Sequence, residues 1–435
     1  MNTQDLINHL VNAAVTAVMP DVFIPAQIKR TGGILSIQDV PYDLDAYRHV
    51  YVISVGKAAV GMTEALDQII HPFVTEGVVL TKHIPERHSL GDQYRILRGN
   101  HPIPGVYSIA GAKAVLELAD KAEVDDLVIF LISGGGSALM SLPVYGIDLE
   151  TMQRFSDMIL SCGANITEFN ILRKHLDLVK GGRLAKHAAP ADQVTIILSD
   201  VVGDPIDIIA SGPTVPDPYT YQDALDILER YAAGNTFPSE IHDMLMRGMD
   251  GKLPETPKPD DPLFHKSDIF LSASNSTAAV AAALEAQRLG FHAQVLNTQL
   301  TGEASEIGKL LPSFFSTLDI QGVYIFGGET TVHITGNGLG GRNLELALGS
   351  VREMAGRENC ILATLATDGE DGPTDAAGAF VTADTYYRAM QIGCDPEAYL
   401  RNNDAYHFFK RIKGLIRTGP TGTNVCDLTF LIRMS

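Results

Sequence analysis

Short, continuously apolar runs recur along this chain and alternate with stretches in which apolar residues repeat every three or four positions. The first pattern is typical of strands buried on both faces, and the second of amphipathic helices. In the first half of the chain the strand-like runs lie at residues 51–55, 76–81, 127–132 and 194–198. Because helical patterns separate these runs, we expect a parallel sheet covered by helices on both faces.

The same alternation resumes in the second half. Strand-like runs lie at residues 268–272, 292–297, 322–326, 361–366 and 428–432, and helical patterns at 277–290 and 303–315. Between the halves, residues 250–261 carry three prolines and charges of alternating sign, a composition typical of a linker. We therefore expect two α/β domains, 1–255 and 262–435.

Length and composition agree with that division. A chain of 435 residues exceeds what one core usually supports, and 45% apolar residues suffice for two. The net charge of −19 argues against nucleic acid or an anionic membrane as a partner. The four cysteines form no C-x-x-C pair, which favours free thiols in a reducing compartment over zinc. Residues 3–18 predict an amphipathic helix rather than a signal peptide, so we expect a soluble, cytoplasmic protein.

Residues with chemical potential follow several of the strand-like runs, where ligands of parallel sheets bind. Lys57 and Asp200 each come shortly after a run. Another run leads into a loop in which successive N–H groups and two hydroxyls could surround an anion, formed by Ser133, Gly134, Gly135, Gly136 and Ser137. The alternative for this loop is a tight strand–helix crossing that needs small residues.

A second glycine-rich stretch lies in the other half of the chain. It leads through Gly340, Gly341, Arg342 and Asn343 into a helical pattern, a suitable place for an anion. Its glycines also fit G-x-G-x-x-G, so a dinucleotide-binding turn, with Asp368 as the ribose partner, is an alternative carried by a weak motif. No Walker A motif is present.

Six basic residues fall between positions 173 and 186, which is unusual in so acidic a chain. They are Arg173, Lys174, His175, Lys180, Arg183 and Lys186. Anion recognition and a solvated helix face remain equal alternatives here. The glycine pair 181–182 predicts a bend between Lys180 and Arg183.

Carboxylates cluster near glycines after two other runs, at Asp200 and Asp204 and again at Asp368, Asp371 and Asp375. Oxygen ligands of this kind suit Mg²⁺. Turns built by Asp-Gly and Gly-Pro sequences are the alternative for the second group.

Taken together, these motifs resemble those of the type II glycerate kinases, which carry a C-terminal MOFRL domain. The similar stretches run almost from end to end: residues 54–58, 101–104, 132–138, 173–176, 180–185, 199–204, 209–214, 327–332, 340–343, 367–378 and 418–424. Two departures are Gly105, where an acid is expected, and Asp177, where serine is common; the second could tune substrate choice.

The resemblance implies a Rossmann-like, DUF4147-like domain over 1–255, a MOFRL-type α/β domain over 262–435, and an active site in the interdomain cleft. It also implies ATP-dependent phosphorylation of D-glycerate to 2-phosphoglycerate with Mg²⁺. We then assign Lys57 and Arg342 to the moving phosphoryl group and Asp200 to the glycerate hydroxyl. Arg173 and Lys174 would pair with the glycerate carboxylate.

The remaining assignments and alternatives follow from the same resemblance. Glu329 and Asp368 are the candidate ligands of Mg²⁺, and the 133–137 loop would hold an anionic group. The rival function is an NAD(P)-dependent hydroxypyruvate reductase, which would oxidise NAD(P)H without ATP. A module that binds glycerate or nucleotide without turnover is a second rival. A homodimer is one alternative for the oligomeric state, which the sequence leaves open.

Overall fold

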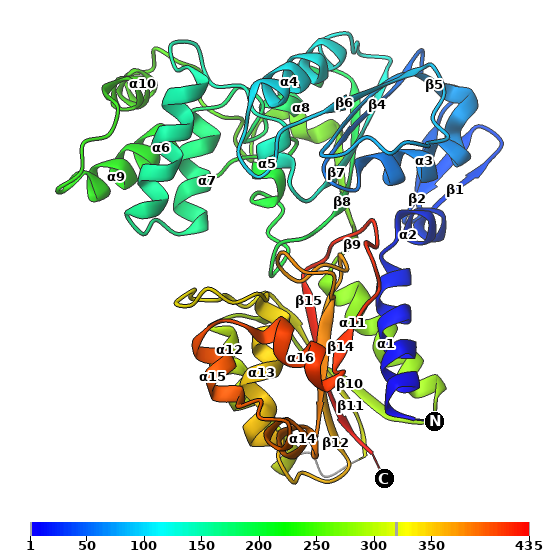
Figure 1. Ribbon diagram of the computed structural model, residues 1–435. Coiled ribbons are helices and arrows are strands. Elements are labelled where there is room, and N and C mark those ends of the chain that lie inside the picture. Colours follow the sequence, from blue (N-terminus) through cyan, green and yellow to red (C-terminus); the bar gives the residue numbers. More distant parts are fainter. Residues whose placement is uncertain (1, 318–320, 435) are drawn as a thin grey trace. The chain divides into compact units, whose positions relative to one another are not determined.

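The computed structural model describes residues 2–317 and 321–434, and the chain forms two compact units. We call them the parallel-sheet unit, made of Phe23–Ser199 and Asp204–Ser272, and the mixed-sheet unit, made of Met1–Val22, Asp200–Gly203 and Ala273–Ser435. Figure 1 labels their helices and strands. Each unit is described by itself below.

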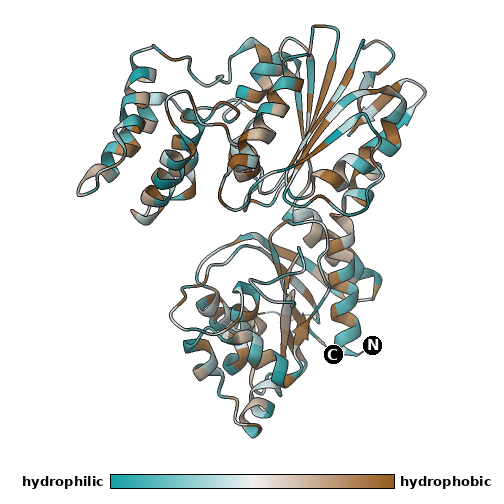
Figure 2. Ribbon diagram, turned by 45° about the horizontal axis from the view of Figure 1, so that its top comes forward, coloured by the Kyte–Doolittle hydropathy of each residue, from teal (hydrophilic) through white to brown (hydrophobic). Residues whose placement is uncertain are grey.

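The parallel-sheet unit contains a six-stranded sheet in the order β6-β5-β4-β7-β8-β9. Its strands are β4 (Val50–Val55), β5 (Val74–Thr81), β6 (Tyr94–Arg98), β7 (Leu127–Ser133), β8 (Asp192–Leu198) and β9 (Ser267–Ala273). Neighbours from β6 through β8 run parallel. Every residue of β4 and β7 is buried, and the sheet is largely coloured as hydrophobic in Figure 2. The predicted parallel sheet is thus confirmed.

Helices of this unit serve two purposes. Some pack on or beside the sheet: α3 (Ala59–Ile70), α4 (Val106–Ala119), α5 (Gly136–Leu139) and α8 (Arg183–Ala188). Others gather around a separate core at one side of it (Figure 1): α6 (Leu149–Ser161), α7 (Ile166–His175), α9 (Tyr221–Ala232) and α10 (Ser239–Met249). Helix α2 (Pro20–Gln27) leads into a small antiparallel sheet of β1 (Ile28–Thr31), β2 (Ile34–Ile37) and β3 (Val40–Asp43).

The mixed-sheet unit has a six-stranded sheet in the order β10-β11-β15-β12-β13-β14. Its strands are β10 (His292–Leu300), β11 (Gly322–Gly328), β12 (Cys360–Ala366), β13 (Gly378–Thr382), β14 (Leu415–Ile416) and β15 (Asp427–Arg433). Among the described residues, β10 and β11 pair in parallel and the other neighbours run antiparallel, with the last strand, β15, inserted between β11 and β12.

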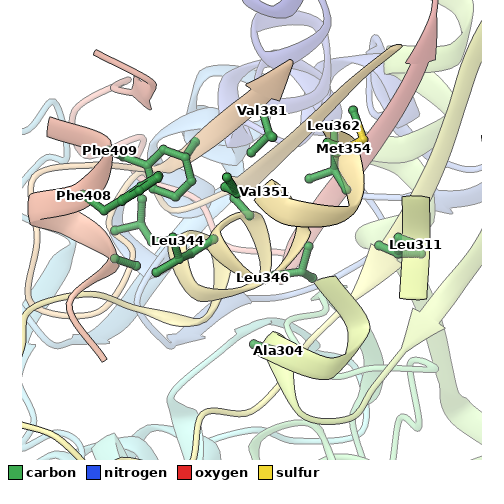
Figure 3. Packing of buried hydrophobic residues seen from close by; sticks show 14 of the residues in the cluster. Ala304, Leu311, Leu344, Leu346, Val351, Met354, Leu362, Val381, Phe408 and Phe409 are labelled. Carbon is green, nitrogen blue, oxygen red and sulfur yellow. The ribbon is translucent and has the colours of Figure 1, made fainter. Parts of the chain in front are cut away.

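Helices cover this mixed sheet and form its core. They are α1 (Thr3–Ala17), α11 (Asn275–Arg288), α12 (Ala304–Leu310), α13 (Arg342–Met354), α14 (Thr385–Gln391), α15 (Pro396–Arg401) and α16 (Ala405–Ile412). Figure 3 shows Leu344 and Val351 of α13 in the same cluster as Leu362 and Phe409. Helix α1 packs on α11, whose inward positions are alanines that allow close approach.

The division of the chain differs from the predicted domains 1–255 and 262–435 in two respects. Helix α1 belongs to the mixed-sheet unit, and β9 belongs to the parallel-sheet unit. Residues 250–261 are no linker between units either: Asp217 N donates to Pro257 O at 2.9 Å, and Glu255 Oε1 lies 3.1 Å from His175 Nε2. These contacts are non-local, so the local Pro-rich composition could not reveal them.

Among the described residues, no single helix is long and apolar enough to cross a membrane. Helices α1 and α2, which meet at a bend of 57°, pass the same length and composition test only as a pair. All four cysteines are free thiols.

Candidate functional site

Backbone hydrogen bonds tie together the carboxyl ends of four parallel strands. Gly56 N donates to Leu80 O at 3.1 Å, Gly99 N to Thr81 O at 2.8 Å, and Lys57 N to Gly134 O at 2.9 Å. The chain extends the sheet from β4 to one side through β5 and β6, and to the other through β7 and β8. The ends of β4 and β7 therefore form the switch point at which open α/β sheets bind ligands.

Lys57 and the 133–137 loop meet at this switch point, as the sequence predicts. Gly56 adopts a φ of +139°, and a β-carbon there would lie 2.0 Å from Ser133 Oγ. Only glycine lets β4 turn so closely against that hydroxyl. Ala58 N donates to the same Ser133 Oγ at 3.2 Å. The side chain of Lys57 is exposed, and no carboxylate or hydrogen-bond acceptor pairs with it among the described residues.

His101 stands over the same loop. Gly135 has a φ of +82°, and a β-carbon on it would lie 3.2 Å from both His101 Nε2 and Lys57 Cε. Burial, together with the charges of Lys57 and Lys82, lowers the pKa of His101 to about 4. The imidazole is therefore neutral at neutral pH. The sequence assigned His101 no role beyond its place in the 101–104 stretch of the resemblance.

Two further side chains continue from the loop. Ser137 Oγ lies 2.8 Å from Ser211 Oγ, and Ser211 Oγ donates to Asn170 Oδ1 at 2.8 Å. Ala210 and Ser211 have φ values of +51° and +62°, a costly conformation for residues with a β-carbon. Sequence reasoning did not assign these residues a role; the signal was the 209–214 stretch within the resemblance.

The basic cluster divides between structural and available charges. Lys174 Nζ lies 3.0 Å from Asp207 Oδ2 and 3.3 Å from Asp217 Oδ1, and Lys180 Nζ lies 2.6 Å from Asp177 Oδ2. Both lysines are 1% exposed. Burial lowers the pKa of Lys180 to about 8, although Asp177 favours its charged form. The assignment of Lys174 to a ligand carboxylate is therefore corrected, because the buried Asp217 and the partly exposed Asp207 already neutralise it.

Arg173 remains next to the 133–137 loop. Its Nη2 lies 3.5 Å from Ser137 O, and its guanidinium stacks on Phe169 at 4.6 Å. The bend expected at the glycine pair is present, with φ values of +57° at Gly181 and +79° at Gly182. Beyond it, Arg183 donates internally to Asp177 O.

In the mixed-sheet unit, Arg342 begins α13 and is held by two carboxylates. Its Nε and Nη2 donate to Asp427 at 2.5 and 3.1 Å, and its Nη1 lies 2.6 Å from Glu329 Oε1. Burial disfavours the guanidinium charge, but Asp427 and Glu329 outweigh it and raise the pKa of Arg342. The side chain is 32% exposed, so part of the guanidinium still faces outward.

Asp371 caps the start of α13 from a distant loop. Its carboxylate accepts from Asn343 N at 3.0 Å, Asn343 Nδ2 at 3.2 Å and Leu344 N at 2.8 Å. Burial raises the pKa of Asp371 to about 6, although these N–H groups favour the charged form. Asn343 is 2% exposed and spends its amide on this cap, so its predicted contact with a ligand is corrected.

Most of the glycines before Arg342 are explained by packing. A β-carbon on Gly341 would lie 2.5 Å from Asp371, and one on Gly336 would lie 2.3 Å from Asn402 O. Gly338 N also donates to Asn402 O at 2.8 Å. The G-x-G-x-x-G match is therefore not a tight strand-to-helix turn, since β11 ends at Gly328 and α13 begins at Arg342, so the geometry argues against the dinucleotide interpretation. Gly340 differs, because a β-carbon there would meet nothing closer than Ala405 at 3.5 Å, so packing does not require this glycine and its predicted contact with a ligand stays a prediction.

The predicted ligands of Mg²⁺ do not gather. Glu329 pairs with Arg342, whereas Asp368 Oδ1 accepts from Glu370 N at 3.2 Å, as in the turn alternative. Across residues 2–317 and 321–434, no group of three or more His, Cys, Asp or Glu side chains is arranged to hold a metal ion. These residues therefore do not fit a protein-bound metal site.

Asp200 lies near Arg342 and Glu329 in the mixed-sheet unit. Cys426 Sγ donates to Asp200 O at 3.0 Å and lies 4.0 Å from Glu329 Oε2. Burial raises the pKa of the Cys426 thiol, and the charges of Glu329, Asp200 and Asp427 add to the effect. Three predicted residues thus share one neighbourhood with Cys426 and Asp427, neither of which the sequence indicated.

Comparisons with known proteins agree with this architecture. Residues 6–246 match a domain of unknown function, DUF4147, and residues 322–427 match the MOFRL family. The chain is 40% identical to the glycerate 2-kinase of Pyrococcus horikoshii, over 99% of this chain and 98% of that protein. It is also 40% identical to the D-glycerate 2-kinase of Thermotoga maritima, over 96% and 95% of the two chains.

A solved structure supports the same relationship. The crystal structure of a glycerate kinase from Thermotoga maritima superposes with a TM-score of 0.86 at 38% identity, covering 99% of each chain. The order of the two matched domains, the near-complete coverage and the shared fold lead to one conclusion. The chain belongs to the glycerate kinase family that joins a DUF4147 domain to a C-terminal MOFRL domain.

Proposed function

We propose that the protein is a glycerate 2-kinase, which transfers the γ-phosphoryl group of ATP to O2 of D-glycerate. The observation that carries the proposal is Lys57, an exposed cation beside the 133–137 loop at the switch point of the parallel sheet, with no carboxylate partner within residues 2–317 and 321–434. In a chain of net charge −19, such a site selects an anionic ligand. Membership of the glycerate kinase family then identifies that ligand class.

The proposed reaction is a single displacement. The O2 hydroxyl of glycerate forms a bond to the γ-phosphorus as the bond from that phosphorus to the bridging oxygen breaks. ADP leaves with the bonding electron pair, and the hydroxyl proton passes to an acceptor. Catalysis of such a step consists mainly of positioning and neutralisation of charge on the moving group.

Residue roles follow from that requirement. Lys57 and Arg342 stabilise the moving phosphoryl group, and the N–H groups of the 133–137 loop hold an anionic part of a substrate. Arg173 pairs with the glycerate carboxylate; Lys174 is left out because its charge is already neutralised. Asp200 orients the attacking hydroxyl or accepts its proton.

Mg²⁺ enters the proposal with ATP rather than through a protein ligand set. Its ligands would be phosphate and water oxygens, an arrangement that Mg²⁺ often adopts. Titration of turnover with MgCl₂ at constant ATP tests this point, since a chelator should abolish activity. Full turnover in excess chelator would remove Mg²⁺ from the proposal.

The decisive experiment is an assay with ATP and D-glycerate, followed by ³¹P NMR of the product. We expect ADP and 2-phosphoglycerate in equal amounts. Oxidation of NAD(P)H by hydroxypyruvate without ATP would instead support the reductase, and binding without turnover would support a binding module. Either result overturns the proposal.

Assembly and location are part of the same proposal. We propose a homodimer, which light scattering of the purified protein checks against the mass of one chain. We also propose a cytoplasmic location, which the four free cysteines suit and cell fractionation tests.

A further inference from the structure

Three polar side chains follow the ends of three neighbouring strands in the parallel-sheet unit. Lys57 follows β4, Lys82 follows β5, and His101 lies just beyond β6. The hydrogen bonds from Gly56 N to Leu80 O and from Gly99 N to Thr81 O fix these strand ends side by side. The three residues therefore start from one rigid edge, although up to 44 positions of sequence separate them.

None of these three side chains has a hydrogen-bond or ion-pair partner within the part of the chain that the structure describes. Other basic side chains of the same unit are satisfied internally: Lys174 by two aspartates and Lys180 by one. Lys57 and Lys82 both act electrostatically on the His101 imidazole, so the two ammonium groups lie near one ring. Burial lowers the pKa of His101 most, and the charges of the two lysines add to it.

We propose that Lys82 and His101 complete, with Lys57, a subsite for the oxygens of a phosphoryl group, with Lys82 as a second cation and the His101 imidazole as a hydrogen-bond donor. This inference rests on the proposed function, because the phosphoryl group is that of a kinase substrate or product. Two ammonium groups and one N–H match a ligand with two or more charges and three terminal oxygens. A carboxylate, with one charge and two oxygens, would leave part of the subsite unused.

The nearby Gly135 supports this assignment. A β-carbon at that position would lie 3.1 Å from the His101 ring and 3.2 Å from Lys57 Cε, so glycine lets both side chains lie directly on the loop. The backbone of the same loop can add N–H donors beside them. A phosphoryl group bound next to these side chains would meet donors from the side chains and from the loop.

The ligand could be the terminal phosphoryl group of ATP or that of 2-phosphoglycerate. Calorimetric titration of the full-length protein with ATP, with 2-phosphoglycerate and with D-glycerate separates these sources. Lys82→Ala and His101→Gln are compared with wild type. The control is Lys113→Ala, which removes an exposed lysine of α4. We expect Lys82→Ala to lower the affinity for at least one phosphorylated probe about tenfold or more, and the affinity for D-glycerate less than about twofold. Whichever phosphorylated probe responds identifies the source.

Three outcomes would overturn the subsite. One is unchanged affinity for both phosphorylated probes in Lys82→Ala and His101→Gln. Another is a loss of affinity for D-glycerate as large as that for the phosphorylated probes. The third is a loss of affinity in Lys113→Ala as large as that in Lys82→Ala, which would show a diffuse charge effect. Turnover of the wild-type protein is measured separately. If wild type turns over and the variants bind as it does, the subsite alone is rejected; if wild type shows no turnover, the proposed function is rejected.

A structural defect is distinguished by two conservative variants. Lys82→Arg keeps a cation, and we expect it to restore most of the affinity lost in Lys82→Ala. His101→Gln keeps an N–H donor, and we expect a smaller loss than in His101→Ala with the same thermal midpoint as wild type. If Lys82→Arg binds no better than Lys82→Ala although both are folded, the proposed role of the charge is wrong.

Discussion

The guanidinium of Arg342 donates two hydrogen bonds to the carboxylate of Asp427, from Nε to Oδ2 at 2.5 Å and from Nη2 to Oδ1 at 3.1 Å. Such a two-bond pair fixes the direction of the guanidinium as well as its position. The two residues start α13 and β15 respectively. Asp427 therefore positions the cation to which we assign the moving phosphoryl group.

A double-mutant cycle on this pair is the first prediction. Arg342→Ala should lower kcat by about three to five decades if the residue acts as an arginine finger does. Asp427→Asn should lower kcat about ten- to hundredfold, because the guanidinium loses its two-bond partner. In the Arg342→Ala background, Asp427→Asn should have no further effect on kcat. Additive losses, or near-normal turnover in Arg342→Ala, would contradict the assigned roles.

Lys57→Ala is the second prediction, for the other unit. The variant should lose most of kcat, because Lys57 is the unpaired cation beside the 133–137 loop. Lys29→Ala removes an exposed lysine of the same unit and should leave kcat within twofold. Steady-state kinetics with saturating ATP and D-glycerate measure both. A matching loss in the two variants would point to net charge rather than to position.

The third prediction concerns the close approach of the His101 and Lys57 side chains to Gly135. Gly135→Ala places a β-carbon 3.2 Å from His101 and Lys57 at a φ of +82°, whereas Gly163→Ala, at +88°, meets no atom within 4 Å. The left-handed conformation costs both variants about 1–2 kcal/mol of stability. Of the two variants, only Gly135→Ala should also bind ATP or 2-phosphoglycerate more weakly than wild type. Urea unfolding measures the loss of stability, and calorimetric titration measures ligand affinity. Normal affinity in Gly135→Ala would show that the positions of His101 and Lys57 over the loop do not matter for binding.

Glu255 gives the fourth prediction, for stability against pH. Burial opposes its charge, but the hydrogen bonds from His175 and from Tyr221 N and Thr256 N bring the pKa of Glu255 down to about 2, against an ordinary 4.5. Its stabilising contribution is therefore present above pH 4.5 and is lost as the pH falls toward 2.

Glu255→Gln removes that pH-dependent contribution. Allowing for partial exposure, wild type should lose about 1–2 kcal/mol more than the variant between pH 6 and pH 3. Urea unfolding at the two pH values measures the difference. Parallel losses in both proteins would mean that the contact of residues 250–261 with α7 contributes nothing of this kind.

The fifth prediction is spectroscopic. The ring signals of His101, assigned by their absence in His101→Gln, should titrate near pH 4 in the free protein, because burial and the charges of Lys57 and Lys82 lower its pKa. Lys82→Ala should move the titration toward 6.5, since one of the two repelling charges is gone. An unchanged pKa in that variant would show that Lys82 does not act on the imidazole.

Strands such as β4, β7 and β12 were predictable because they are largely apolar, buried runs, which local sequence reveals, whereas β1, β2, β3 and β6 carry exposed or polar residues and were not predicted. Lys57 and the 133–137 loop were predictable for a related reason: each directly follows such a run. Lys174 and Arg342 show where prediction stops. The partners that neutralise or hold them, Asp217 and Asp427, lie 43 and 85 positions away. No local pattern distinguishes a paired charge from an available one, and the insertion of β15 into the mixed sheet is equally non-local.

The first helix of the chain has a consequence for folding during synthesis. Helix α1 is made long before its partner α11, which begins at Asn275, and before the central strand β15 of its unit, which ends at Arg433. The parallel-sheet unit is complete by residue 272. Since domains fold as units while the chain is being made, we expect the parallel-sheet unit to assemble first and the apolar face of α1 to stay unpaired until α11 has been synthesised.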